Sequence, residues 1–185
     1  MSPRTLVQRG FTLVELLIVV IILAILAAIV IPQFSSATDD TKEAALDANL
    51  GGLRNAIELY KAQHSTYPGA TATNAGGTCT TKGAATVAGA QAFIDHMTMY
   101  SDALGNTCTV GDATNYKYGP YLRKAVPVDP YMQKGSVAAE IVFTATGTPA
   151  VPAAATGGWS YDSKSGQIFM NSNANDSKSR ALSTH

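Results

Sequence analysis

The sequence predicts an α+β protein in which a long N-terminal helix carries a small antiparallel β-sheet head. Three observations support this fold class. Residues 11–31 form an apolar run, a helical pattern continues to about residue 64, and strand-like segments appear only beyond residue 138. A helix over 11–64 is too long for the remaining chain to cover. Its first half must therefore contact lipid or other copies of the protein.

The apolar run has the length of a membrane-spanning helix. Within residues 11–31 only Thr12 and Glu15 are not plainly hydrophobic. About 20 helical residues cover the roughly 30 Å of a bilayer's hydrocarbon core. The basic residues Arg4 and Arg9 precede the run, which favours a cytoplasmic N-terminus. Cleavage within the run, as in a secretory signal peptide, is disfavoured because the run continues past its small residues.

Glu15 is the unusual residue of this run. An ionised carboxylate at membrane depth costs about 3 kcal/mol on insertion scales. In one interpretation Glu15 lies near the cytoplasmic interface and is neutralised by protonation. In the other, a cut between Gly10 and Phe11 creates a positive α-amine, which in one copy reaches Glu15 of a neighbour displaced along the helix axis. Such a pair would favour one assembly register over others.

The helix is predicted to continue beyond the membrane-spanning part. Apolar residues recur at spacings typical of one helix face: Leu46, Leu50, Leu53, Ile57 and Tyr60. Pro32 lacks an N–H donor and crowds the preceding turn, so a kink or local melting is expected there. Gly51-Gly52 is compatible with a tolerated defect and equally with a flexible or closely packed point. Tyr67-Pro68 follows the end of the helix.

Five segments are expected along the chain. They are a polar N-terminus at 1–10, a membrane-spanning helix at 11–32, its amphipathic continuation at 33–66, a globular α+β head at 67–170 and a mobile Asn/Ser-rich tail at 171–185. The head pattern predicts a short helix over 91–100, a strand over 139–144 and a hairpin of 159–161 with 167–170. The sheet would cover the apolar stripe of the long helix. His96 lies off the apolar face of its helix and is expected to be exposed.

The two cysteines, Cys79 and Cys108, both follow the apolar run. If that part of the chain is exported, a disulfide is the default interpretation, and closing such a loop contributes about 3 kcal/mol. The alternative is two buried thiols. A metal site is not favoured, because His64, His96 and His185 have no ligand-like spacing to either cysteine.

The composition excludes several function classes. Thirteen basic residues balance 13 acidic ones, so the chain has no net positive charge of the kind that nucleic-acid-binding proteins use. Residues 116–118 with Arg123-Lys124 form a small basic-aromatic cluster, which on a neutral protein is more typical of plain surface. Asp162 and Asp176 match no cation-binding loop. No catalytic, cofactor-binding or metal-binding motif is present, so neither an enzyme nor a cofactor is predicted.

The N-terminal motif resembles that of a known family. Residues 9–17, Arg-Gly-Phe-Thr-Leu-Val-Glu-Leu-Leu, followed by an apolar run and Pro32, closely resemble the class III leader of type IV pilins and type II secretion pseudopilins. The resemblance extends over about residues 8–66. Shorter stretches at 119–122, 126–130 and 158–161 resemble the pseudopilin side of the family.

The resemblance implies a pilin fold and a structural role. A prepilin peptidase would cut after Gly10 and methylate the amine of Phe11. Glu15 would assist assembly by pairing with a neighbour's N-terminus, and the helix around Pro32 would loosen in the filament. The implied partners are further copies, related pilins, the inner-membrane assembly platform and, before assembly, lipid. The implied location is the bacterial inner membrane, with the head exported, and then a periplasmic or cell-surface filament.

Two other functions remain open at this stage. A minor pilin could act in DNA uptake or adhesion through its head, and the cluster at 116–118 with Arg123-Lys124 is the only feature that supports this. A membrane-anchored exported enzyme is the third hypothesis, for which the sequence offers no site.

Overall fold

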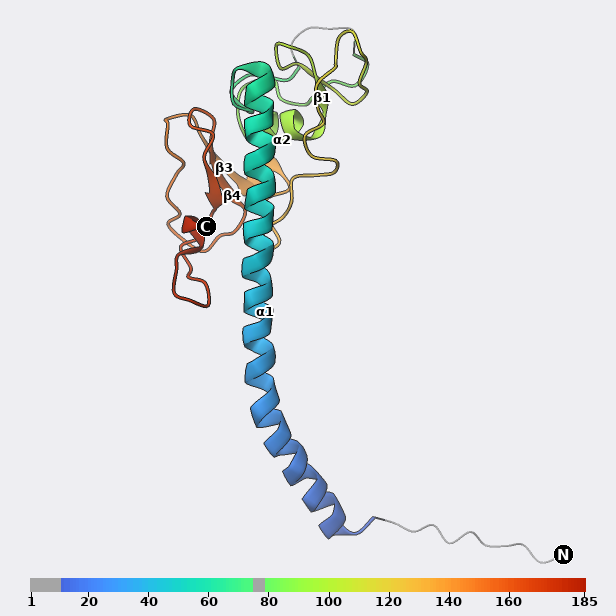
Figure 1. The fold of residues 1–185 in the computed structure, drawn as a ribbon, viewed down its shortest axis with the longest axis vertical. Helices are drawn as coiled ribbons and strands as arrows, with labels where there is room; N and C mark the ends of the chain where they lie inside the picture. Colours follow the sequence, from blue (N-terminus) through green and yellow to red (C-terminus); the bar gives the residue numbers. More distant parts are fainter. Residues whose placement is uncertain (1–10, 75–78) are drawn as a thin grey trace, which may run out of the picture. The chain divides into compact units, whose positions relative to one another are not determined.

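The protein is described by a computed structural model that covers residues 11–74 and 79–185, with the backbone alone for Pro32 and residues 34–36. The chain divides into two compact units, with the boundary between Asp40 and Thr41. Helix α1, Leu13–His64, contributes to both units and is helical through Pro32. The kink expected at Pro32 stays a prediction. The second half of α1 belongs with the head (Figure 1).

The head has the predicted mixture of helix and short strands, which confirms the α+β class. After α1, its elements are α2 (Ala90–Thr98), β1 (Tyr100–Ser101), β2 (Thr107–Cys108), the 3-10 helix η1 (Ala138–Glu140), β3 (Ile141–Thr144), β4 (Trp159–Asp162), β5 (Ile168–Met170) and the 3-10 helix η2 (Leu182–Thr184). The predicted helix ends two residues early, and the predicted strand over 139–144 begins with η1. The antiparallel pair β1–β2 was not predicted, because two-residue strands leave no periodic pattern.

The larger sheet has the order β3-β4-β5. Strands β4 and β5 form the predicted antiparallel hairpin, and Gly166 in its turn has the expected positive φ of 74°. Strand β3, however, pairs with β4 in parallel, so the sheet is mixed and the expectation of purely antiparallel pairing is corrected. Two parallel strands start at the same end of the sheet, so their connection must carry the chain back to that end. This takes about a dozen residues or more. The irregular segment 145–158 supplies that length.

The core forms around the predicted stripe of α1. Leu46, Leu50, Leu53, Ile57 and Tyr60 are all fully buried. They belong to one cluster with side chains of α2 and the larger sheet: Phe93, Met97, Ile141, Trp159, Tyr161, Ile168 and Met170. Each large apolar side chain buried here stabilises the head by about 1.5–3 kcal/mol. A Cβ added at Gly51 or Gly52 would meet open space, so neither marks a close packing point in this chain.

Asp129 organises the irregular segment before η1. Its side chain is fully buried. Oδ1 accepts hydrogen bonds from the backbone N–H groups of Tyr131 and Met132 at 2.9 and 2.6 Å. Oδ2 accepts from the N–H groups of Lys134 and Gly158 at 3.1 and 2.9 Å. One carboxylate therefore ties a proline-rich turn to the residue that precedes β4.

The C-terminal tail packs against the head. Composition predicted a mobile segment over 171–185, but the structure buries Leu182 in the main core cluster, and η2 contacts β5. The polar residues of the tail close their own turns, as the backbone N–H groups of Lys178 and Arg180 donate to Asp176 Oδ1. A composition rich in Ser and Asn thus encodes turns here.

His96 is fully buried, which corrects the expectation that it is exposed. Its Nδ1 accepts a hydrogen bond from the N–H of Gly69, and its Nε2 donates to the carbonyl of Gly105, both at 2.9 Å. Since a backbone N–H can only donate and a carbonyl can only accept, the ring is neutral and carries its proton on Nε2. Burial lowers the pKa of His96 to about 4. The apolar pattern assigned only one face of α2 to the core, whereas α2 is covered on more than one side.

Replacing Asp129 by alanine should lower the free energy of unfolding by at least about 3 kcal/mol. Four N–H donors would lose their acceptor, and each buried orphan donor costs about 1–3 kcal/mol. Urea unfolding of the full chain in detergent, followed by circular dichroism, measures the change. Asp112→Ala is the matched control, because its exposed carboxylate closes a similar turn with Thr114 and Asn115 that water can satisfy. Equal losses in both variants would contradict the assigned role.

Acid should destabilise the head through His96. Its pKa of about 4 in the folded state lies below the ordinary value of 6.5, so the unfolded chain binds a proton that the folded chain excludes. The stability present above pH 6.5 is therefore lost as pH falls towards 4, by about 3 kcal/mol in total. Fluorescence of Trp159, the one tryptophan of the chain, can follow unfolding at each pH.

His96→Gln is the control for this titration, because glutamine can donate and accept without titrating. His64, whose pKa burial also lowers, titrates in both proteins and cancels in the difference. The wild-type protein should lose more stability than the variant between pH 7 and pH 4. The same pH dependence in both would refute the assignment.

Candidate functional site: the N-terminal segment

Helix α1 exposes all of its large apolar side chains from Leu13 to Ile31 in the single chain. Their exposed fractions range from 42% to 84%. By length and composition Leu13–Ile31 can cross a membrane, and no part of the span is buried by the described residues. An apolar surface of this extent in water is strongly unfavourable. The segment requires either lipid or partner helices.

The structure places Glu15 in the first turn of α1, where it forms a capping box with Thr12. Glu15 Oε2 accepts hydrogen bonds from the N–H and from the hydroxyl of Thr12, both at 2.9 Å. In return the N–H of Glu15 donates to Thr12 Oγ1 at 3.1 Å. The carboxylate also lies at the positive end of the helix dipole. This role was not predicted from the sequence, although Thr-x-x-Glu before an apolar run is a recognised signal of a capping box.

The capping box leaves part of the Glu15 carboxylate for another partner. Both bonds from Thr12 end on Oε2. Among the described residues, Oε1 has no hydrogen bond to another group, and the side chain is exposed. The cap therefore orients the carboxylate and holds it available for a further donor. Pairing with a neighbour's amine stays a prediction.

The predicted cleavage site lies at the edge of the described chain. Gly10 falls outside the described residues. Phe11 is the first described residue and is 87% exposed, two positions before the helix begins. Cleavage after Gly10 and methylation of Phe11 stay predictions.

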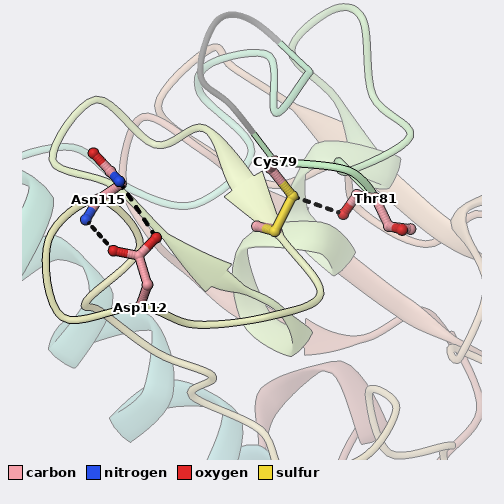
Figure 2. The surroundings of a disulfide bond; sticks show 5 residues. Cys79, Thr81, Asp112 and Asn115 are labelled. Atoms are coloured by element: carbon pink, nitrogen blue, oxygen red, sulfur yellow. Dashed lines mark hydrogen bonds between the residues drawn. A yellow bond between two sulfur atoms is a disulfide. The ribbon is translucent and has the colours of Figure 1, made fainter.

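The predicted disulfide between Cys79 and Cys108 is present (Figure 2). It joins the irregular chain after α1 to strand β2. Cys79 Sγ lies 3.2 Å from the carbonyl oxygen of Thr81, and Asp112 and Asn115 close the turn that follows β2. The bond thus fastens a loop that otherwise has little regular structure.

The basic-aromatic cluster does not form a common surface. Tyr116 is buried, and the ring of Tyr118 packs edge-on against His64 of α1 with centroids 5.0 Å apart. Tyr121 donates a hydrogen bond to Gln63 and packs against Tyr60. The rings of Tyr118 and Tyr121 thus contact side chains of the long helix and Tyr116 is buried, so these rings do not form an exposed stacking platform for bases. Arg123 and Lys124 are exposed in an irregular segment.

The two aspartates considered for a cation bind elements of the head instead. Asp162 Oδ2 accepts from the N–H groups of Thr146 and Gly147, at 2.9 and 3.1 Å. Asp176 Oδ2 pairs with the Arg180 guanidinium at 2.7 Å. Each carboxylate therefore serves a separate turn.

Comparison with known proteins finds similarity over about a third of the chain. Residues 6–31 match the prokaryotic N-terminal methylation motif. Over 61 residues the chain is 41% identical to type II secretion system core protein G of Pseudomonas aeruginosa and 38% identical to that of Vibrio cholerae. These alignments cover 33% of this chain and 43% and 42% of the two relatives.

A type IV pilin is similar over a stretch of almost the same length. The chain is 40% identical over 60 residues to the type IV narrow pilus major component PilA5 of Thermus thermophilus, which covers 32% of this chain and 52% of the relative. The chain thus spans about half or less of the length of these relatives. No solved structure matches it. In its N-terminal segment, the chain thus carries the methylation motif and is similar to a type II secretion core protein and to a type IV pilin.

Proposed function

We propose that this protein is a structural subunit of a type IV pilus-like or type II secretion filament. The observation that carries the proposal is the helix Leu13–Ile31, which exposes its large apolar side chains and lies within the matched methylation motif. A helix that is apolar all round is stable only when it is covered. Lipid covers it before assembly, and helices of neighbouring subunits cover it in the filament.

Glu15 sets the register of this assembly in our proposal. Cleavage after Gly10 by a prepilin peptidase creates a positive amine on Phe11, and methylation keeps that charge. In the filament, the amine of one subunit contacts Glu15 of the next, at the oxygen that Thr12 leaves available. An ion pair removed from water is stable only when both charges are satisfied, so other registers are disfavoured.

The proposal assigns the head to the exported side of the inner membrane. Arg4 and Arg9 favour a cytoplasmic N-terminus. The Cys79–Cys108 bond belongs to an oxidising compartment, such as the periplasm. The assembly platform and related pilins would be further partners. Similar proteins occur in both secretion systems and pili, so we propose the role of a structural subunit, which is common to both.

A role in DNA uptake or adhesion is not favoured. Its one supporting feature was the basic-aromatic cluster of residues 116–118 with Arg123-Lys124, in which Tyr116 is buried and Tyr118 packs against His64 of α1. We assign no enzymatic activity to the chain.

Mass spectrometry of protein from a host with a prepilin peptidase should show a mature chain that begins at methylated Phe11. The same chain from a host without the peptidase should keep residues 1–10. A chain that begins at Met1 in the competent host would refute the leader assignment.

Glu15→Gln should reduce incorporation into filaments by at least about tenfold, because losing one partner of a buried ion pair costs several kcal/mol. Glutamine still completes a capping box, so this variant removes the charge and preserves the helix start. Quantitative immunoblotting of sheared filaments against total membrane protein measures incorporation. Membrane insertion should be unchanged.

Thr12→Ala is the matched control, since it removes the cap, at a cost of about 1 kcal/mol, and keeps the charge of Glu15. It should assemble far better than Glu15→Gln. Normal assembly of Glu15→Gln, together with a defect in Thr12→Ala, would show that Glu15 acts through the cap alone.

A further inference from the structure

Helix α1 contains two adjacent glycines, Gly51 and Gly52, within the part that supports the head. A glycine weakens a helix about fivefold relative to alanine, because it loses more backbone freedom on folding. At neither position would an added Cβ meet another group within 4 Å. Helix α1 is thus intrinsically weak at these two positions, and neither glycine packs closely against the rest of the described head.

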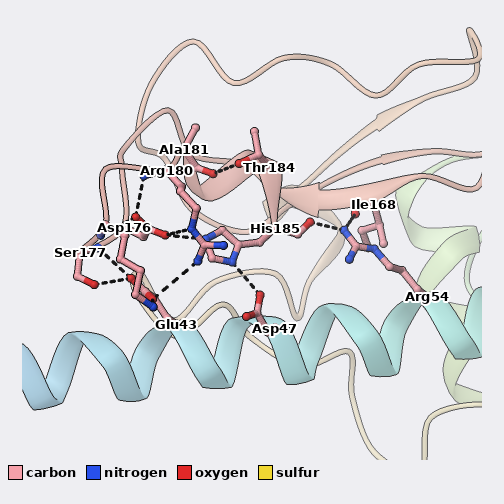
Figure 3. A network of polar contacts seen from close by, with 11 residues as sticks. Glu43, Asp47, Arg54, Ile168, Asp176, Ser177, Arg180, Ala181, Thr184 and His185 are labelled. Atoms are coloured by element: carbon pink, nitrogen blue, oxygen red, sulfur yellow. Dashed lines mark hydrogen bonds and ion pairs between the residues drawn. The ribbon is translucent and has the colours of Figure 1, made fainter.

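One residue of the tail is bound to α1 on both sides of these glycines (Figure 3). Nδ1 of His185 lies 2.7 Å from Oδ1 of Asp47, which precedes the glycines. The backbone oxygen of His185 accepts a hydrogen bond from Nη2 of Arg54, which follows them. The side chain of His185 is only 1% exposed, so it is held firmly in this position. A single tail residue therefore bridges the weak stretch of the helix.

The bridge runs along one face of α1. Asp47, Gly51 and Arg54 follow one another at spacings of four and three residues, which places them in one row on the helix surface. In this row Gly51 contributes no side chain, and His185 connects the residues on either side of it. The contact thus supports the helix along the row in which its own side chains are interrupted.

Both ends of the bridge are anchored further. Beyond the glycines, Nη2 of Arg54 also donates to the carbonyl oxygen of Ile168 in β5, at 3.1 Å, so this end is tied to the larger sheet. Before the glycines, Glu43 accepts hydrogen bonds from the N–H and hydroxyl of Ser177 at 2.9 and 2.7 Å. Glu43 also accepts one from the Lys178 ammonium at 3.2 Å. The tail is thus fixed to α1 before the weak stretch and to α1 and the sheet after it.

We propose that the C-terminal segment 176–185 braces α1 across Gly51 and Gly52 and holds closed a hinge at these glycines. Leu50 and Leu53 fix the core face of this turn, and the brace fixes the adjoining face. When either contact of His185 is broken, the backbone hydrogen bonds around the glycines open more often. The brace acts only while both of its ends are bound, so its two contacts work as one unit.

This inference does not depend on filament assembly, because every residue of the brace lies within the head unit of one chain. It can be tested on the full chain in detergent micelles at one fixed pH, by amide hydrogen exchange along α1. In an α-helix the N–H groups of residues 52–56 bond to the carbonyls of residues 48–52, so these amides report opening at the glycines. The amides of residues 58–63 provide an internal reference.

Two variants break the two ends of the brace. His185→Leu keeps an apolar side chain and removes both ring nitrogens, and Arg54→Met keeps the helix propensity and removes the guanidinium. Each should lower the protection of amides 52–56 about tenfold relative to 58–63, the effect of losing one hydrogen bond to a charged group. The double variant should lose no more than either single one, because the contacts act together. Additive losses, or unchanged protection in either single variant, would overturn the proposal.

Gly51→Ala combined with Gly52→Ala tests whether the glycines form the hinge. The structure has open space for both methyl groups, so these changes introduce no clash. In this background the loss of protection caused by His185→Leu should shrink to about twofold or less, because alanine supplies the missing helix propensity. A loss that stays at about tenfold would overturn the proposal, since the tail would then support α1 in some other way.

Lys178→Ala is the matched control. Its ammonium contacts Glu43, which lies on the N-terminal side of the glycines, so it takes no part in the bridge across them. This variant should leave the protection of amides 52–56 unchanged. A loss equal to that of His185→Leu would contradict the proposal. An equal fall at residues 58–63 in His185→Leu would do so too, because it would indicate general destabilisation of the head.

Discussion

The burial of one stripe of α1 is the interaction on which the head depends. Leu46, Leu50, Leu53, Ile57 and Tyr60 provide the surface on which α2 and the β3-β4-β5 sheet pack. The three strands are short, and a sheet of this size needs an apolar partner to be stable. The large share of irregular chain in the head is possible because this helix supplies a rigid support along its whole second half.

The parts of the structure that could be predicted share a periodic or strongly local signal. The stripe of α1 and the β4–β5 hairpin follow from apolar spacing and turn chemistry, and the pairing of Cys79 with Cys108 follows from there being two cysteines beyond an apolar run. The capping box of Thr12 and Glu15 had an equally local signal, which the unusual charge of Glu15 obscured. The disulfide and the hairpin show that local sequence signals can identify structure even in a head with many irregular segments.

The parts that could not be predicted depend on contacts between distant residues. The parallel pairing of β3 is decided by the path of residues 145–158, which have no period. His96 is buried because the loops that carry Gly69 and Gly105 close over it, and a single helix pattern cannot show this. The docking of the tail rests on Glu43 and Asp47, which on α1 alone look like ordinary solvated charges. For His96 and for the tail, the local sequence indicated exposure to solvent, whereas the tertiary structure provides packing and hydrogen-bond partners.

The disulfide has a consequence for the durability of the exported head. The covalent ring closed by Cys79 and Cys108 contains all of α2 and strand β1. A protease that cut one peptide bond inside this ring would leave both pieces attached, with Phe93 and Met97 still held in the core by their packing. The backbone of this segment can thus be broken once without dividing the molecule.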